Sequence, residues 1–288
     1  MAASTAIDWT DATLNPVTWR CTPVGIECLN CYAQTQTNRY QGPGAFTSGP
    51  PELKPWRLLL PWKDPEMREA VRIFLMSMSD PFHSGLSFAD MALIWAMMAA
   101  DRRHTYQVLT KRAGAMHSRM NSKRFALEVH ASLARLEGMA RDVRRLTPWR
   151  QQLLQDIEVA KASFSWPLPN VWLGVSCGTQ HAADQRIPRL IGSPARVRFL
   201  SCEPLLERVV LARWTPDDLA QREIHWVIAG GESGGRHRPV KLDDLRSLRD
   251  ECHQGDVPFW LKQIGGVTHA AGGDTLDGQT WKRFPVAA

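Results

Sequence analysis

The chain has 288 residues, of which 44% are hydrophobic and 22% charged, and its formal net charge is +6. This composition is typical of a globular protein with a sizeable core, and a chain of this length can form one large α/β domain. The sequence has no apolar stretch of about 18 residues, which argues against a membrane span, and its N-terminus lacks the basic flank and apolar run of a secretory signal. We therefore expect a cytoplasmic protein without a membrane partner. The positive charge allows a nucleic acid as partner but does not require one.

Short apolar runs recur along the chain, and each is followed by a polar loop and then by a helical pattern. Such an alternation predicts a parallel sheet that is covered by helices on its outer face. Six strands, with the segment before Cys21 as a further candidate, predict an α/β fold of the partial TIM-like (β/α) barrel type. An open doubly wound sheet is the alternative. The predicted strands span residues 72–78, 105–110, 170–176, 197–202, 224–229 and 258–262, and helices are predicted at 88–99, 180–191 and 242–254.

Two segments interrupt this alternation. Residues 41–65 are rich in Pro and Gly and are predicted to form a long loop. Between about residues 117 and 165, apolar residues recur at steps of three and four. This predicts a helical hairpin inserted between the strands at 105–110 and 170–176, which are the third and fourth strands when the candidate before Cys21 is counted. We expect a single domain over residues 1–288, with this hairpin as an elaboration. The basic stretch at 135–150 is interpreted as a solvated helix face rather than a nucleic-acid patch.

Three of the six cysteines lie close together, at Cys21, Cys28 and Cys31. In a reducing compartment, clustered cysteines indicate metal or redox chemistry more often than disulfides. Iron–sulfur clusters that only carry electrons usually take four cysteines, and structural zinc is four-coordinate and closed. Three thiols without a nearby fourth cysteine therefore favour a reactive iron–sulfur cluster. The alternative is a zinc ion that takes His83 or Asp80 as its fourth ligand and staples a nucleic-acid-binding module.

Polar residues follow each of the six predicted strands. In a parallel barrel the chemistry gathers at the carboxyl ends of the strands, so these residues describe a pocket ring with both charges and many hydrogen-bonding groups. Gly230-Gly231-Glu232 is the most suggestive part, because glycines let a ligand approach the backbone and the carboxylate can accept hydrogen bonds from a ligand ammonium group. The predicted ring comprises Ser77, Ser79, Asp80, Thr110, Lys111, Arg112, Ser176, Gln180, Ser201, Cys202, Glu203, Gly230, Gly231, Glu232, Ser233, Lys262 and Gln263.

Several segments resemble a phage-associated, radical-SAM-like protein family of unknown function, the phage "Gp thirty-seven/sixty-eight" family. The resemblance covers nearly the whole chain except the helical insertion. It is carried by residues 7–17, by the three cysteines with Tyr32-Ala33, and by residues 77–80, 108–112, 166–176, 199–206, 226–234 and 276–281.

Membership in this family implies an enzyme that holds a [4Fe–4S] cluster on Cys21, Cys28 and Cys31. S-adenosylmethionine would chelate the fourth iron, and its reductive cleavage would give methionine and a 5′-deoxyadenosyl radical that abstracts a hydrogen from a substrate. A reductant protein such as flavodoxin or ferredoxin is expected as a partner. Lys111 and Glu203 are the predicted catalytic residues. The predicted cofactor-binding residues are Ser77, Ser79, Asp80, Thr110, Ser176, Gln180, Glu203, Gly230, Gly231, Glu232 and Lys262.

The chain departs from the broader radical SAM superfamily in two places. The superfamily commonly has three residues between its first two cysteines, whereas this chain has six, and its Gly-Gly-Glu motif usually follows the second strand rather than a late one. Ser77, Ser79 and Asp80 are therefore alternatives to Glu232 as the contact of the S-adenosylmethionine amino group. Lys111 resembles a basic residue at the same strand end in spore photoproduct lyase-like enzymes.

The expected substrate is a nucleobase in DNA or RNA, and the alternative is a protein or peptide. A barrel that has lost its chemistry and binds a partner is a third hypothesis. Trp9 and Trp19 lie close to the cysteines in the sequence and are predicted to be walls of the site, whereas Trp95, Trp172 and Trp226 occupy core-like positions.

Overall fold

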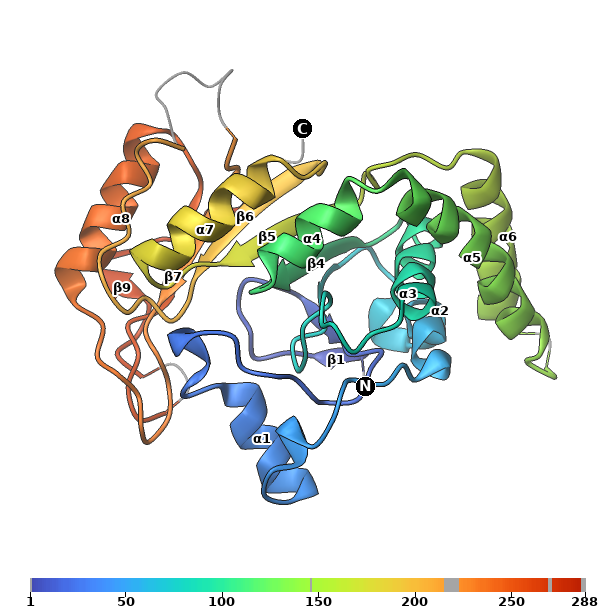
Figure 1. The fold of residues 1–288 in the computed structure, drawn as a ribbon, viewed down its shortest axis with the longest axis horizontal. Helices are drawn as coiled ribbons and strands as arrows, with labels where there is room; N and C mark the ends of the chain where they lie inside the picture. The colour runs from blue at the N-terminus through green and yellow to red at the C-terminus, as the bar shows by residue number, and fades with distance from the viewer. Residues whose placement is uncertain (1, 146, 215–222, 269–270, 286–288) are drawn as a thin grey trace.

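The computed structural model describes residues 2–145, 147–214, 223–268 and 271–285, and it has the predicted α/β fold (Figure 1). Seven parallel strands, β2 to β8, form a curled half-barrel in chain order, and the short strand β1 pairs antiparallel with β2 at its first edge. The fold is thus a partial TIM-like barrel. The strands are β1 (Ala2–Ser4), β2 (Ala12–Leu14), β3 (Arg72–Leu75), β4 (Thr105–Thr110), β5 (Val171–Ser176), β6 (Val197–Cys202), β7 (Trp226–Gly230) and β8 (Phe259–Gln263), with a separate hairpin of β9 (Thr275–Leu276) and β10 (Gln279–Thr280).

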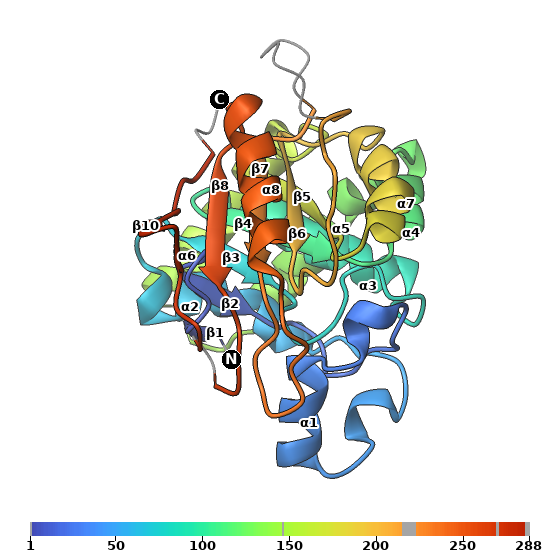
Figure 2. The same ribbon diagram turned by 90° about the vertical axis from the view of Figure 1, so that its left-hand side faces the viewer.

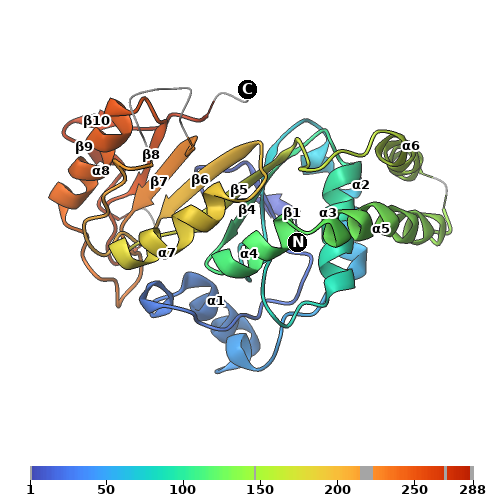
Figure 3. The same ribbon diagram turned by 45° about the horizontal axis from the view of Figure 1, so that its top comes forward.

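Four helices follow strands of the barrel and cover the outer face of the sheet (Figures 1 and 3). Two of them begin at a capping residue: Ser87 accepts a hydrogen bond from the Asp90 amide before α3, and Thr179 accepts one from the Ala182 amide before α7. Side chains that point outward from the strands join these helices in one apolar core. The four helices are α3 (Phe88–Ala100), α4 (Ala113–Met120), α7 (Gln180–Ile191) and α8 (Leu242–Gln254).

The predicted helical hairpin between the strands at 105–110 and 170–176 is present as α5 (Lys123–Arg141) and α6 (Pro148–Ala162). It lies at the opposite end of the molecule from α8, and α5 packs on α3 (Figure 3). Three of its arginines have partners within the protein: Arg135 donates to the Ala89 carbonyl and Arg150 to the Ala140 carbonyl, while Arg141 pairs with Glu137. This supports the interpretation of the stretch as a helix face rather than a nucleic-acid patch.

Residues 41–65 are more ordered than the sequence suggested. They contain the short helix α2 (Leu60–Lys63) and two 3-10 turns, Ala45–Thr47 and Pro55–Leu59. The prediction of a long loop failed because Pro55 begins a turn instead of only interrupting structure, and because Leu58 and Trp62 are buried against the core. Within the described residues, no helix is both long and apolar enough to cross a membrane.

Aromatic rings fill the concave face of the half-barrel. We call this cluster the aromatic floor. On β5 and β6 it occupies the amino-terminal half of the strand, and serines occupy the inward positions at the carboxyl ends. Trp9 belongs to the floor: it is 2% exposed and its ring centroid lies 4.6 Å from that of Phe74, so its predicted place in the wall of the site is wrong. The floor comprises Trp9, Phe74, Trp172, Phe199, Trp226 and Trp260, together with Val197 and Ile228.

At the amino end of β4, a buried acid and a buried base oppose each other in their effect on stability. Burial raises the pKa of Asp101 to about 6, despite a hydrogen bond from the Tyr106 hydroxyl, and burial lowers the pKa of His104 to about 4. Between those values the folded state keeps a proton on Asp101 that the unfolded state loses, so this residue makes stability fall as pH rises. His104 does the reverse, because only its unfolded form binds the proton.

Asp101→Asn should therefore leave the contribution of His104 to the pH dependence of stability unopposed. We expect the free energy of unfolding of this variant to rise by about 2–3 kcal/mol between pH 4 and pH 6.5, whereas the parent protein should show a flatter profile. Urea unfolding at a series of pH values measures it. Asp142→Asn, at the exposed end of α5, is the control that should keep the parent profile. A variant profile parallel to the parent's would contradict the opposition of the two groups.

Candidate functional site

The segment that contains the three cysteines crosses the carboxyl ends of the strands. We call residues 20–32 the cysteine loop. In Figures 1 and 2 its blue ribbon lies near the strand ends and leads into α1 (Tyr32–Gln41), beside the orange loop that follows β7. Hydrogen bonds confirm this placement: the Tyr32 hydroxyl donates to the Ser77 carbonyl after β3, and Asn30 donates to Glu232 after β7. The half-barrel thus brings the cysteines to the end where barrel enzymes place their chemistry.

All three thiols of the loop are free and half-buried. Cys21 and Cys31 pack with Trp19 against one small apolar cluster, so Trp19 lies beside two of the cysteines. Cys28 lies outside that cluster but is joined to Cys31, whose amide donates to the Cys28 carbonyl over 3.3 Å. The apolar cluster consists of Ala33, Phe46 and Met78.

Cys21, Cys28 and Cys31 offer the type of ligand that a soft metal centre uses, and their loop lies at the carboxyl ends of the strands. Three free thiols share one loop, and thiolates are the ligands that iron–sulfur clusters use. Within the described residues, no three His, Cys, Asp or Glu side chains converge as a metal-binding group. The remaining cysteines, Cys177, Cys202 and Cys252, are buried, and Cys177 and Cys202 have their sulfurs 3.9 Å apart in the core behind β5 and β6.

The guanidinium group of Arg112 lies beside Cys21. Its Nη1 lies 3.6 Å from the Cys21 sulfur, and its Nη2 donates to the Thr22 carbonyl over 2.8 Å. Burial raises the pKa of the Cys21 thiol, and the positive charge of Arg112 opposes that increase. A cation beside a thiol favours the thiolate, which is the form that binds metals.

Asp80 holds Arg112 in this position. Its carboxylate accepts hydrogen bonds from the Thr110 hydroxyl at 2.7 Å, from the Lys111 amide at 3.1 Å and from the Phe82 amide at 2.9 Å, and it pairs with Arg112 at 3.1 Å. The structure therefore brings together the predicted ring residues at the ends of β3 and β4. Asp80 and Thr110 join these two strand ends. Both oxygens of the Asp80 carboxylate are already hydrogen-bonded within the protein.

Glu203 and Lys262 form an ion pair between the ends of β6 and β8. Tyr32 lies close to this pair. The residue as a whole is 44% exposed, but desolvation of its hydroxyl raises its pKa, and the nearby Cys31 and Glu203 raise it further. Ser79 donates from its hydroxyl to the Arg20 carbonyl at 2.6 Å, so it anchors the start of the cysteine loop. Four of the predicted ring residues, Ser77, Ser79, Glu203 and Lys262, thus lie beside the loop.

Gly230, Gly231 and Glu232 serve the protein itself. A Cβ atom at Gly231 would lie 2.0 Å from the Ile264 carbonyl oxygen, so this glycine is required by the segment after β8 rather than by a ligand. Glu232 accepts hydrogen bonds from Asn30 and from Arg238. Burial alone would raise the pKa of Glu232, but these hydrogen bonds outweigh it and hold the pKa below its usual value. Glu232 is therefore an anchor of the cysteine loop.

Two further predicted ring residues, Gln180 and Ser176, differ in their surroundings. Gln180 begins α7, accepts from the Val210 amide at 2.7 Å and donates to Asp184, so its side chain fixes the segment after β6 and does not reach the cysteines. Ser176 ends β5 and is 1% exposed, and its hydroxyl has no hydrogen-bond partner among the described residues.

Four residues of the site were missed by sequence reasoning: Glu27, Asn30, Arg186 and Arg238. Each makes a contact across at least 159 positions of the chain. Only Glu27 carries a local signal, because it is the one charged residue between Cys21 and Cys31. The others look like ordinary surface residues of loops and helices in the sequence.

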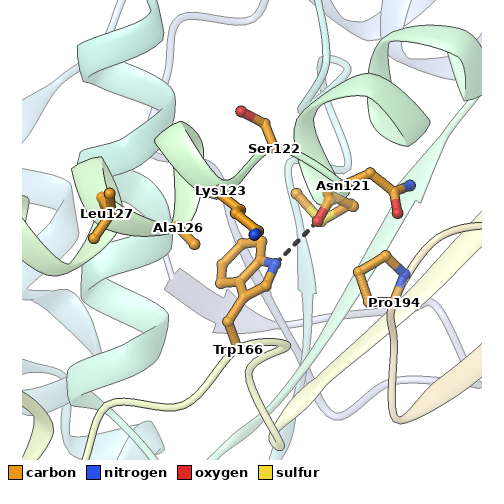
Figure 4. Close-up of a pocket in the computed structure, with 8 residues that line it drawn as sticks. Asn121, Ser122, Lys123, Ala126, Leu127, Trp166 and Pro194 are labelled. Atoms are coloured by element: carbon orange, nitrogen blue, oxygen red, sulfur yellow. Dashed lines mark hydrogen bonds between the residues drawn. The ribbon is translucent and has the colours of Figure 1, made fainter.

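A surface hollow of about 470 Å³ lies away from this site (Figure 4). Trp166 forms one side and donates from its indole nitrogen to the Met120 carbonyl at 2.9 Å, next to the exposed Leu127 of α5. Because Trp166 precedes the amino end of β5, the hollow is at the other end of the strands from the cysteine loop. It takes no part in the candidate site.

Comparisons with known proteins identify the family of the chain. The sequence model of a family described as "Protein of unknown function (DUF5131)" matches residues 4–285. No curated protein and no solved structure matches the chain.

Proposed function

The chain belongs to the DUF5131 family, and we propose that it is a radical SAM enzyme that holds a [4Fe–4S] cluster on Cys21, Cys28 and Cys31. One observation carries the proposal: three free thiols on a single loop lie across the carboxyl ends of a parallel half-barrel. When bound, the cluster and S-adenosylmethionine would supply a reducing electron and a hydrogen-abstracting adenosyl group. The residues of this chain supply position and shielding.

Each part of the site then has a definite task. Arg112 favours the thiolate of Cys21, and the apolar cluster beneath Cys21 and Cys31 keeps water from that side of the loop. Glu203, held by Lys262, and Lys111 remain our proposed catalytic residues, since both are half-exposed at strand ends of the same rim. The buried hydroxyl of Ser176, at the carboxyl end of β5, lacks a hydrogen-bond partner among the described residues.

We propose a nucleobase in DNA or RNA as the substrate and a flavodoxin or ferredoxin as the reductant. The net charge of +6 supports a polyanionic substrate, although Arg135 and Arg150 of the hairpin already donate to backbone carbonyls of the protein. A reducing cytoplasm would keep the three thiols free for metal.

A closed zinc site is the second candidate, and the position of His83 favours it. Its Nε2 lies 3.0 Å from the Thr22 hydroxyl, one residue from Cys21, and its Nδ1 accepts a hydrogen bond from the Gly85 amide. Burial, followed by the charge of Arg112, lowers the pKa of His83 and favours the neutral imidazole that binds metals. A fourth ligand from His83 would close the site and leave no position for S-adenosylmethionine.

Anaerobic reconstitution with iron and sulfide separates the two candidates. The proposed enzyme should gain a visible charge-transfer absorbance that bleaches on reduction with dithionite, and mass spectrometry should then detect 5′-deoxyadenosine formed from S-adenosylmethionine. The assay is run with and without single-stranded DNA or RNA, and with a peptide mixture as the third arm. Tight stoichiometric zinc, without a cluster under any of these conditions, would refute the proposed enzyme.

A further inference from the structure

Between Cys21 and Cys31, the cysteine loop buries its charged side chain and exposes two apolar side chains. Glu27 is 5% exposed, whereas Val24 and Ile26 are 45% and 54% exposed. Folding ordinarily buries the apolar side chains and exposes the charge. A buried carboxylate is retained only where a partner compensates its desolvation, so Glu27 should have a specific contact that the loop is built to make.

That contact is Arg186 of α7. Its Nη1 lies 2.7 Å from Glu27 Oε1 and also donates to the Ser176 carbonyl at 2.6 Å. The side chain of Arg186 is 12% exposed and that of Glu27 is 2% exposed, so the ion pair is shielded from solvent. One guanidinium group therefore joins the cysteine loop to the end of β5.

The backbone leaves room for this carboxylate at two glycines. A Cβ atom at Gly25 would lie 2.5 Å from Glu27 Oε2. A Cβ atom at Gly178, after β5, would lie 1.9 Å from the Pro204 carbonyl oxygen and 3.4 Å from Glu27 Cγ. The close approach of loop and strand end thus depends on Gly25 and Gly178, as expected for a contact that the fold requires.

Glu27 is coupled to Cys28 through a single 3-10 turn, Ile26–Cys28, in which the Cys28 amide donates to the Gly25 carbonyl at 3.0 Å. The same turn is held by Arg238, which donates to the Ile26 carbonyl at 3.1 Å. We infer that Glu27 and Arg186 are a positioning pair that sets the place of Cys28, and that the six-residue spacing after Cys21 exists to let Glu27 reach α7. The inference deepens the proposed function and rests on it for the metal.

Cobalt(II) binding to the full-length metal-free protein tests this pair without any enzymatic assay. The thiolate-to-cobalt charge-transfer band reports how many thiols bind. Glu27→Gln and Arg186→Gln should each weaken cobalt binding about 10–100-fold and reduce the band, as loss of residues that support metal ligands typically does. Glu158→Gln, an exposed partner of Lys161 in α6, is the matched control and should bind as the parent does.

Two further measurements make each outcome decisive. Circular dichroism melting identifies a variant that has unfolded, and Glu27→Asp, which keeps the charge on a shorter side chain, is then measured in its place. If Cys28→Ala removes the cobalt thiolate band while Glu27→Gln and Arg186→Gln keep parental affinity, the positioning pair is refuted and the metal site stands. If Cys28→Ala leaves the band unchanged, the three-thiol site itself is refuted.

Discussion

Cys28→Ala protein will lose its iron–sulfur cluster. We expect bound iron and acid-labile sulfide after anaerobic reconstitution to fall at least roughly tenfold relative to the parent, because the variant keeps only two of the three thiols that the cysteine loop offers. Cys21→Ala and Cys31→Ala should behave in the same way. Iron and sulfide analysis measures the loss, and the visible absorbance of the reconstituted protein provides a second readout.

Cys252→Ala is the matched control for this series. Cys252 is fully buried in α8, and burial raises its pKa well above the usual range of a thiol, so it is inert toward metal. It should keep the iron content of the parent. If the control and Cys28→Ala lost iron equally, or if neither did, the cluster would not depend on the cysteine loop.

The strands and outer helices could be predicted because their signals are local. The predicted boundaries of the strand at 197–202 and the helices at 180–191 and 242–254 agree with β6, α7 and α8. A continuous apolar run reports a strand that is covered on both faces, and a period of 3.6 residues reports a helix on a core. Neither signal requires knowledge of the partner, so the half-barrel followed from the sequence alone.

The internal contacts of the site could not be predicted, because they pair residues far apart in the chain. Glu27 and Arg186 are 159 positions apart, and Asn30 and Glu232 are 202 apart. A single sequence states that a residue can form an ion pair, but it does not state with which partner. Trp9 was misplaced for the same reason: it is close to the cysteines in the sequence, yet it packs in the aromatic floor.

Some carboxylates in the predicted ring of polar strand ends hold arginines of the protein, and the sequence does not distinguish these from carboxylates that are free to bind a cofactor. Asp80 and Glu232 were predicted to bind a cofactor, but each carboxylate holds an arginine that in turn contacts the cysteine loop. Glu27, which lies on the loop itself, reaches the end of β5 through Arg186, so three buried carboxylates and their arginines fix the loop to the barrel. Buried ion pairs contribute little net stability but constrain geometry, which is what a site with three soft ligands on one loop requires.

Trp226→Ala should be the most destabilising single change in the barrel. Trp226 is fully buried in the aromatic floor, and its indole nitrogen donates to the Arg283 carbonyl at 3.0 Å. Replacing a core tryptophan by alanine leaves a cavity and typically costs about 3–5 kcal/mol, and urea unfolding measures the loss. Trp56→Ala, at a residue that is 57% exposed, should change the free energy of unfolding by less than about 0.5 kcal/mol. Equal losses of unfolding free energy in the two variants would mean that the aromatic floor does not stabilise the strands. The strand ends that carry the candidate site would then have to be held in place by other contacts.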